Sequence, residues 1–133
     1  MKDQAQKNKE FYLNYHQTME EAEYYTMELL EQFIESEKLI NHILYFKKMF
    51  PDYHVVIDEV LAEGDSVFVR AHFVGTHTGE VDGIPPTLKK VNTPFALRYV
   101  IRNNKFVDFW AIASEAEMLE QMGLARKEWE EAF

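Results

Sequence analysis

The sequence contains no cysteine, and it carries only 14 lysines and arginines against 23 aspartates and glutamates. Without cysteine there can be no disulfide framework, no thiolate ligand for zinc and no thiol nucleophile. The formal net charge of −9 would repel a phosphate backbone instead of neutralising it. The shortage of basic residues therefore predicts no nucleic-acid partner, and the absence of cysteine is consistent with a reducing cytoplasm.

Long apolar runs are also missing. No stretch approaches the roughly 20 apolar residues that a helix needs to cross a membrane, and residues 1–7 lack the apolar core of a signal peptide. The chain has no internal repeat, linker or low-complexity segment. A length of 133 residues with 47% apolar content suits one core, which would bury roughly two-thirds of the unfolded surface. We expect a single soluble, cytoplasmic domain over residues 1–133 with no membrane partner.

The first third of the chain has apolar residues at steps of three and four, which is the spacing that lines one face of a helix. Asp3 and Ser36 are suitable N-caps, and Pro51 cannot continue a helix. This pattern predicts three helices, over residues 3–23, 24–33 and 36–50.

After Pro51 the apolar period changes to about two, which is typical of strands. Residues 63–65 are a turn, and so are residues 103–105, where asparagine tolerates the left-handed conformation. The pattern predicts two hairpins built from four strands: residues 53–61, 66–74, 94–102 and 106–113.

The strands are followed by a last helical segment. Ser114 at the N-cap and Glu117 three residues later match the capping box, and Gly123 can close the helix. We expect a side-chain cap at Ser114 and a charged tail over residues 124–133 that is helical or frayed.

Helices first and an antiparallel sheet afterwards predict an α+β domain, with the helices packed on one face of a curved sheet. The strand over residues 94–102 is apolar on both faces, apart from Arg98. A second apolar face needs a cover, which a second copy of the chain would supply, so we expect a homodimer. Arg98 would then pair with an acid at the dimer interface or bind a ligand.

Glycine and proline are scarce, but three of the five glycines and two of the four prolines lie in residues 75–87. His77 lies among them. Its near-neutral pKa would suit acid/base work if the ring faced a pocket, whereas a local hydrogen bond that shapes the loop is the alternative.

The chain resembles the SnoaL-like polyketide (ester) cyclases of the nuclear transport factor 2-like superfamily. The resemblance spans about residues 37–123 and is carried, in order, by residues 50–52, 63–65, 70, 75–79, 83–87, 109–110 and 121–123. It implies a cone-shaped α+β barrel, usually a dimer, with an apolar pocket between the sheet and the helices.

The resemblance also implies a reaction and a site. Characterised cyclases use an aspartate at the end of the last strand as general acid/base for an intramolecular aldol closure, and this position falls on Ser114 here. The histidine that the family often places before its tryptophan falls on Phe109. A serine hydroxyl cannot hold a proton abstracted beside a carbonyl near neutral pH. If the chain is an enzyme, its site differs from that of the characterised cyclases. Its candidate catalytic residues are Ser114, at the position of the family aspartate, and His77.

Four residues are candidates for substrate binding. Trp110 and Ile112 are expected to share a strand face with Ser114 as pocket wall, although a tryptophan there can equally be core. Tyr15 could donate its hydroxyl to a ligand or only pack, and Arg98 is the fourth candidate. No histidine spacing suggests a metal ligand set, and no cofactor is expected. The sequence thus predicts a pocket for a small apolar or aromatic carbonyl compound, used by a cyclase or isomerase or by a binding module that has lost the acid/base residue.

Overall fold

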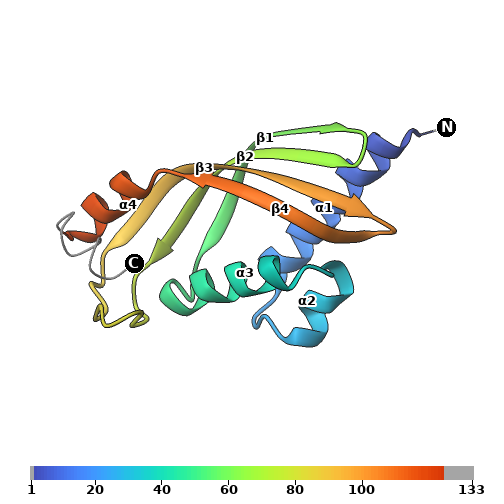
Figure 1. The fold of residues 1–133 in the computed structure, drawn as a ribbon. Helices are drawn as coiled ribbons and strands as arrows, with labels where there is room; N and C mark the ends of the chain where they lie inside the picture. The colour runs from blue at the N-terminus through green and yellow to red at the C-terminus, as the bar shows by residue number, and fades with distance from the viewer. Residues whose placement is uncertain (1, 125–133) are drawn as a thin grey trace.

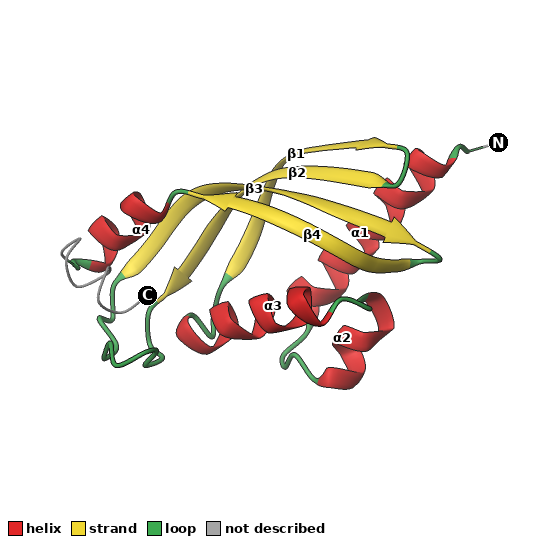
Figure 2. Cartoon of the chain, in the orientation of Figure 1, coloured by secondary structure: helices red, strands yellow, loops and turns green. Residues whose placement is uncertain are grey.

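The computed structural model describes residues 2–124, in which helices come first and one sheet follows (Figure 1). The helices pack on one face of a curved antiparallel sheet, so the predicted α+β fold is confirmed (Figure 2). Residues 125–133, which include most of the expected tail, lie outside the described part. The elements are α1 (Gln4–Glu21), α2 (Met27–Phe33), α3 (Glu37–Met49), β1 (His54–Glu63), β2 (Ser66–Thr76), β3 (Lys90–Arg102), β4 (Lys105–Ala113) and α4 (Glu115–Met122).

The first three helices begin at side-chain caps. Asp3 accepts a hydrogen bond from the Gln6 amide at 2.8 Å, and Ser36 accepts one from the Leu39 amide at 3.2 Å, as expected. The second helix starts later than expected because Thr26 is its cap and accepts from the backbone three residues on. A cap satisfies one of the free amides of the first helical turn, which is why these polar residues decide where each helix begins.

The four strands pair in the order β1-β2-β3-β4. The expected hairpins are present, and Asn103 and Asn104 both have positive φ, at 51° and 57°, in the tight turn between β3 and β4. This is the backbone conformation that suits a two-residue turn between right-twisted strands. Breaks in register at Ile57/Glu59 and at Val100/Ile101 are bulges, which bend and twist a sheet.

Strand β3 begins four residues before the expected start at Pro94 and pairs with β2 as far as Thr76. Proline is tolerated here because it lies just past the end of β4. The Pro94 carbonyl accepts from the Ser114 amide, where the ladder to β4 ends, so the missing amide of proline removes no ladder bond.

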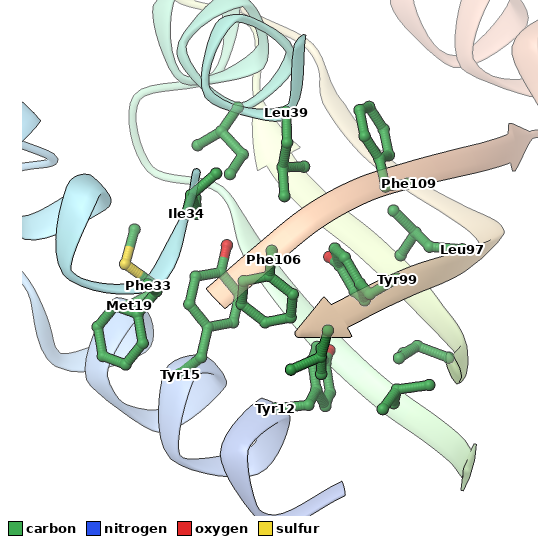
Figure 3. Close-up of a cluster of buried hydrophobic side chains, with 14 of the residues drawn as sticks. Tyr12, Tyr15, Met19, Phe33, Ile34, Leu39, Leu97, Tyr99, Phe106 and Phe109 are labelled. Carbon is green, nitrogen blue, oxygen red and sulfur yellow. The ribbon is translucent and has the colours of Figure 1, made fainter. Parts of the chain in front are cut away.

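The main core lies between the concave face of the sheet, α1 and α3. Aromatic rings dominate it, and Figure 3 shows Tyr12 and Tyr15 on α1 reaching toward Tyr99 and Phe106 on the sheet. The Tyr15 and Phe106 rings meet edge to face at 4.8 Å between centroids. A second, smaller cluster lies under the loop between β2 and β3 and contains Met49, Phe50, Phe73, Val81, Val91, Met118 and Met122.

The side-chain cap expected at Ser114, before the last helix, is not formed. Ser114 occupies the N-cap position of α4, but its side chain makes no capping hydrogen bond. Its backbone has φ −85° and ψ 75°, whereas Ser36 has φ −70° and ψ 114°. The capping box with Glu117 is therefore not formed. Gly123 ends the helix in the left-handed conformation with φ 75°, as expected.

Candidate functional site

A cavity of about 110 Å³ lies between the sheet and the helices α1 and α3. That is several times the roughly 10–15 Å³ that one water molecule requires. Its walls are largely aromatic and aliphatic, with Phe95 and Leu97 from β3 and Ala111 and Ala113 from β4. Both alanines are exposed, so the cavity opens beside the end of β4. An enclosed apolar space with a few polar groups is the usual form of a small-molecule site.

Three tyrosine hydroxyls face this space. Tyr12, Tyr15 and Tyr99 line the cavity, and none of their hydroxyls has a hydrogen-bond partner within residues 2–124. In the same part of the chain, the one fully enclosed side-chain nitrogen or oxygen without a partner is Nε2 of His77. The three tyrosine hydroxyls are therefore not sealed in the core but open to the cavity.

These tyrosines are protonated at neutral pH. Burial is the main cause that raises the pKa of Tyr15 well above its usual value, and the neighbouring Tyr99 adds to the effect. Burial also raises the pKa of Tyr12 and of Tyr99. A neutral phenol donates a hydrogen bond, so each of the three can serve a carbonyl oxygen of a ligand.

Two imidazoles and one carboxylate also line the cavity: His16 and Glu20 on α1, and His42 on α3. Burial lowers the pKa of His16, and the charge of Glu20 opposes that change. Burial alone lowers the pKa of His42, whose ring lies 5.0 Å from both Phe46 and Phe109. Both histidines are thus largely neutral near pH 7 and are able to accept a proton.

The end of the cavity near Glu20 is shaped by two further tyrosines. Tyr25 and Tyr53 meet edge to face at 6.1 Å between ring centroids. The Lys47 ammonium lies 4.2 Å from the centroid of Tyr25 and 4.9 Å from that of Tyr53. Lys47 itself does not line the cavity, so this cation contacts the outside of the aromatic wall and holds it in place.

Of the predicted binding residues, only Tyr15 lies in the cavity wall. Trp110 and Ile112 share a strand face, as expected, but that face points away from the helices and leaves them 45% and 67% exposed. Their neighbours Ala111 and Ala113 line the cavity instead. The physical reason is the alternation of strand side chains, in which a shift of one residue exchanges the two faces.

Arg98 lies on the same outer face, opposite Trp110 in the pairing of β3 with β4. Its Nε donates a hydrogen bond to Ser66 Oγ at 2.9 Å. The charge of Arg98 also contributes to the lowered pKa of Asp108, although Lys38 is the larger cause. Arg98 is therefore placed for a contact outside the sheet and not for a ligand in the cavity.

His77 does not line the cavity either. It is completely buried, and its Nδ1 accepts a hydrogen bond from the Thr87 amide at 3.1 Å, with Thr87 Oγ1 at 2.9 Å. The ring packs against Phe50 at 5.6 Å, and burial lowers its pKa. This placement matches the alternative in which His77 shapes its own loop.

The glycines around His77 have a steric role. The amides of Thr78 and Gly79 both donate to the Met49 carbonyl at the end of α3. A Cβ added at Gly79 would lie 1.8 Å from the Lys48 carbonyl oxygen, which is far inside any real contact. The glycine-rich segment therefore lets this loop lie directly on the backbone of α3.

Ser114 is absent from the cavity lining, while the neighbouring Ala113 is part of it. Phe109, at the position where the resemblance implied a histidine, is buried and contacts His42. Neither position supplies a titrating group to the cavity.

Sequence reasoning missed His16, Glu20 and His42. A signal for the first two was available, because His16 and Glu20 follow Tyr12 at successive steps of four residues on one face of α1. Within residues 2–124 no cluster of three or more histidine, aspartate or glutamate side chains is arranged to hold a metal ion. None of the helices in that range is long and apolar enough to cross a membrane.

Comparison with known proteins identifies the family of this chain. The sequence matches the SnoaL-like polyketide cyclases over residues 9–122. A candidate SnoaL-like polyketide cyclase from Jannaschia sp. is similar in structure, with a TM-score of 0.78 and 16% identity over 94% of this chain and 98% of that chain. AclR, a candidate hydroxylase from Streptomyces galilaeus, has a TM-score of 0.73 and 18% identity over 96% of this chain and 90% of that chain.

A SnoaL-like polyketide cyclase from Agrobacterium tumefaciens has a TM-score of 0.70 and 14% identity over 87% of this chain and 98% of that chain. At such identities the likeness shows the fold alone. No curated protein matches the sequence. The cone-shaped nuclear transport factor 2-like fold is thus confirmed, and because the family match covers most of its length, this chain belongs to the SnoaL-like polyketide cyclase family.

Proposed function

We propose that the cavity binds a small carbonyl compound with an aromatic or apolar body, and that the protein catalyses acid/base chemistry of the aldol or isomerase kind on it. The observation that carries the proposal is the set of open tyrosine hydroxyls of Tyr12, Tyr15 and Tyr99 in a largely apolar wall. A protonated hydroxyl stabilises the oxyanion that forms when a carbon beside a carbonyl loses its proton.

The charged residues of the cavity wall indicate which class of ligand can bind. Among residues 2–124, no lysine or arginine is part of the cavity lining, and Glu20 is its one carboxylate. An anionic ligand would lose its hydration without gaining a cationic partner, which is costly. The ligand that fits is therefore uncharged, as a ketone or an ester is.

A binding module without catalysis is the second candidate. It is favoured by the absence of a titrating side chain at Ser114 and Phe109, the two positions where the resembling cyclases carry theirs. Binding is common to both candidates, and turnover separates them.

We also propose a homodimer formed through the outer face of the sheet. Exposed apolar side chains from three strands lie on it, including Val56 at 50%, Phe68 at 39% and Trp110 at 45%. Side chains of this kind on one sheet face are typical of an interface. The single-domain organisation and the cytoplasmic location expected from the sequence stay predictions.

Ligand binding is tested by calorimetric titration with four uncharged probes: acetophenone, propiophenone, benzylacetone and ethyl benzoylacetate. We expect at least one to bind, and Tyr15→Phe to weaken binding by roughly 2–10-fold, because one hydrogen bond contributes about 0.5–1.5 kcal/mol. Tyr24→Phe is the matched control, since Tyr24 is 71% exposed and outside the cavity lining. If none of the four binds, the proposed ligand class is wrong.

A further inference from the structure

We propose that His16 is the catalytic base of this cavity and that Glu20 is the positioning residue that stabilises its protonated form. The inference rests on the proposed carbonyl ligand and adds the residues that move the proton. It places the acid/base function on α1 and not at the end of the last strand.

His16, Glu20 and the tyrosines beside them lie on one face of α1. His16 and Glu20 are four residues apart on α1, so their side chains are neighbours on the helix surface. Both line the cavity, and Tyr12 and Tyr15 of the same face present their open hydroxyls beside them. The His16 ring stacks on the Tyr12 ring, with 6.2 Å between centroids and an angle of 25°. A base and several hydroxyl donors therefore face one ligand space.

His42 is a second imidazole in the cavity wall, and its surroundings make it a poorer proton acceptor than His16. His42 packs between Phe46 and Phe109, and no acid opposes the effect of burial on its pKa. A proton taken up there would create a poorly solvated cation without a partner. At His16 the nearby Glu20 charge favours the protonated form. The cost of accepting a proton is thus lower at His16, in the way that a carboxylate supports the histidine of a hydrolase triad.

Glu20 is held at the edge of the cavity. Its side chain is 27% exposed, and its Oε1 lies 3.5 Å from Nδ1 of His54, an exposed residue outside the cavity lining. The nearby cation Lys47 also senses this carboxylate: burial lowers the pKa of Lys47, and the Glu20 charge opposes that change. Glu20 therefore lies between the cavity and the exposed His54.

The reaction step balances without a co-reactant. His16 takes the proton from the carbon beside the ligand carbonyl, the C–H electron pair forms the carbon–carbon double bond, and the carbonyl π pair moves to oxygen. The resulting enolate oxygen accepts a hydrogen bond from a tyrosine hydroxyl such as that of Tyr15. The enolate carbon then either takes the proton back from His16 or attacks a second carbonyl of the same molecule. In the second case the new alkoxide receives the proton.

The test uses the full chain and the tightest binder among the four probes, and NMR follows the exchange of the hydrogens beside its carbonyl in D₂O. We expect His16→Gln to lower the protein-dependent exchange rate by at least ~100-fold, the low end for general acid/base catalysis. Its dissociation constant for the probe should stay within about threefold of the parent, as expected for a residue that acts on the transition state. His54→Gln is the matched control, because it removes the other histidine beside Glu20 and should leave the exchange rate unchanged.

A pH profile tests Glu20. The base is active when neutral, and the Glu20 charge raises the pKa of His16, so Glu20→Gln should move the rise in exchange rate to lower pH. A residue that merely supported the fold would lower the rate without moving the profile. Glutamine keeps the shape of the side chain, and the folded fraction of each variant is checked by circular dichroism.

The outcomes are distinct. If a probe binds and the parent protein accelerates no exchange, the inference fails while the binding proposal stands. If exchange persists in His16→Gln and is lost in His42→Gln, the base is His42 and the inference is overturned. If no probe binds, the proposed function fails first and the inference with it.

Discussion

Ser36 and Ser114 both precede a helix, yet only Ser36 caps one. The difference lies in two backbone torsions. At Ser36 the chain is extended, and the side-chain oxygen reaches the Leu39 amide, whereas Ser114 follows the end of an edge strand with a ψ of 75°. At the residue scale, the same side chain therefore contributes stability at one position and not at the other.

This difference gives a prediction. Ser36→Ala should lower the free energy of unfolding by about 1 kcal/mol, the usual value of an N-cap hydrogen bond. Ser114→Ala should change it by less than about 0.5 kcal/mol, because no bond is lost. Urea unfolding curves of the two variants and the parent decide the point. Equal losses at the two serines would mean that Ser114 caps α4 in solution.

At the scale of elements, the loop between β2 and β3 is held against the end of α3 by backbone contacts. Thr78 and Gly79 donate to the Met49 carbonyl, and His77 is bound to Thr87 across the same loop. The loop covers the smaller of the two core clusters, in which Val81 and Phe50 are buried. Gly79 and His77 are thus explained by packing.

Gly79→Ala should destabilise the protein by about 1–3 kcal/mol, because the new methyl group meets the backbone oxygen of Lys48. Glu80→Ala, at the exposed next residue, is the control and should stay within about 0.5 kcal/mol. Thermal unfolding followed by circular dichroism measures both. A Gly79→Ala variant as stable as the parent would contradict the close approach of loop and helix.

At the scale of the whole molecule, the sheet has one face covered by helices and one face with exposed apolar side chains that nothing in the described chain covers (Figure 2). Sedimentation at micromolar concentration should give about twice the mass of one chain. Ile112→Lys should shift the protein toward the monomer, because it places a charge at the proposed interface. Tyr24→Lys changes a residue that is equally exposed but lies away from the sheet, and should leave the dimer intact. A parent protein that sediments as a monomer would disprove this arrangement.

One buried and two half-buried histidines predict how stability depends on pH. Burial lowers the pKa of His16, His42 and His77 below the ordinary 6.5, so the unfolded chain binds protons there more tightly than the folded chain. This contribution to stability should therefore be present above about pH 6.5 and be lost as the pH falls below that value, with a slope of at most ~1.4 kcal/mol per pH unit for each proton. The lowered pKa values of Asp52 and Asp108 act only below about pH 4.

Urea unfolding at about pH 7.5 and pH 5.5 measures this effect. His42→Gln removes one of the three groups, so the loss of stability between the two pH values should be smaller in this variant than in the parent. An equal loss would show that His42 takes no part in the dependence.

The sequence by itself determined the elements and the fold class. Asp3, Ser36 and Pro51 act on the residues beside them, and the asparagine turn before Lys105 needs only its own torsions, so their effects could be predicted locally. The order of helices and strands then restricted the architecture to helices packed on one face of a sheet. The cavity itself could be expected only through the family resemblance.

The tertiary structure alone decided which residues face the cavity. Strands that are apolar on both sides give no local signal for the inner face, so Ala111 and Ala113 could not be distinguished from Trp110 and Ile112 until the helices covered one side. The roles of the histidines depended on contacts between residues far apart in the chain. His77 is sealed in its loop by Thr87 and Phe50, whereas His16 faces the strands from α1, and only the packing of helix on sheet places it beside the ligand space.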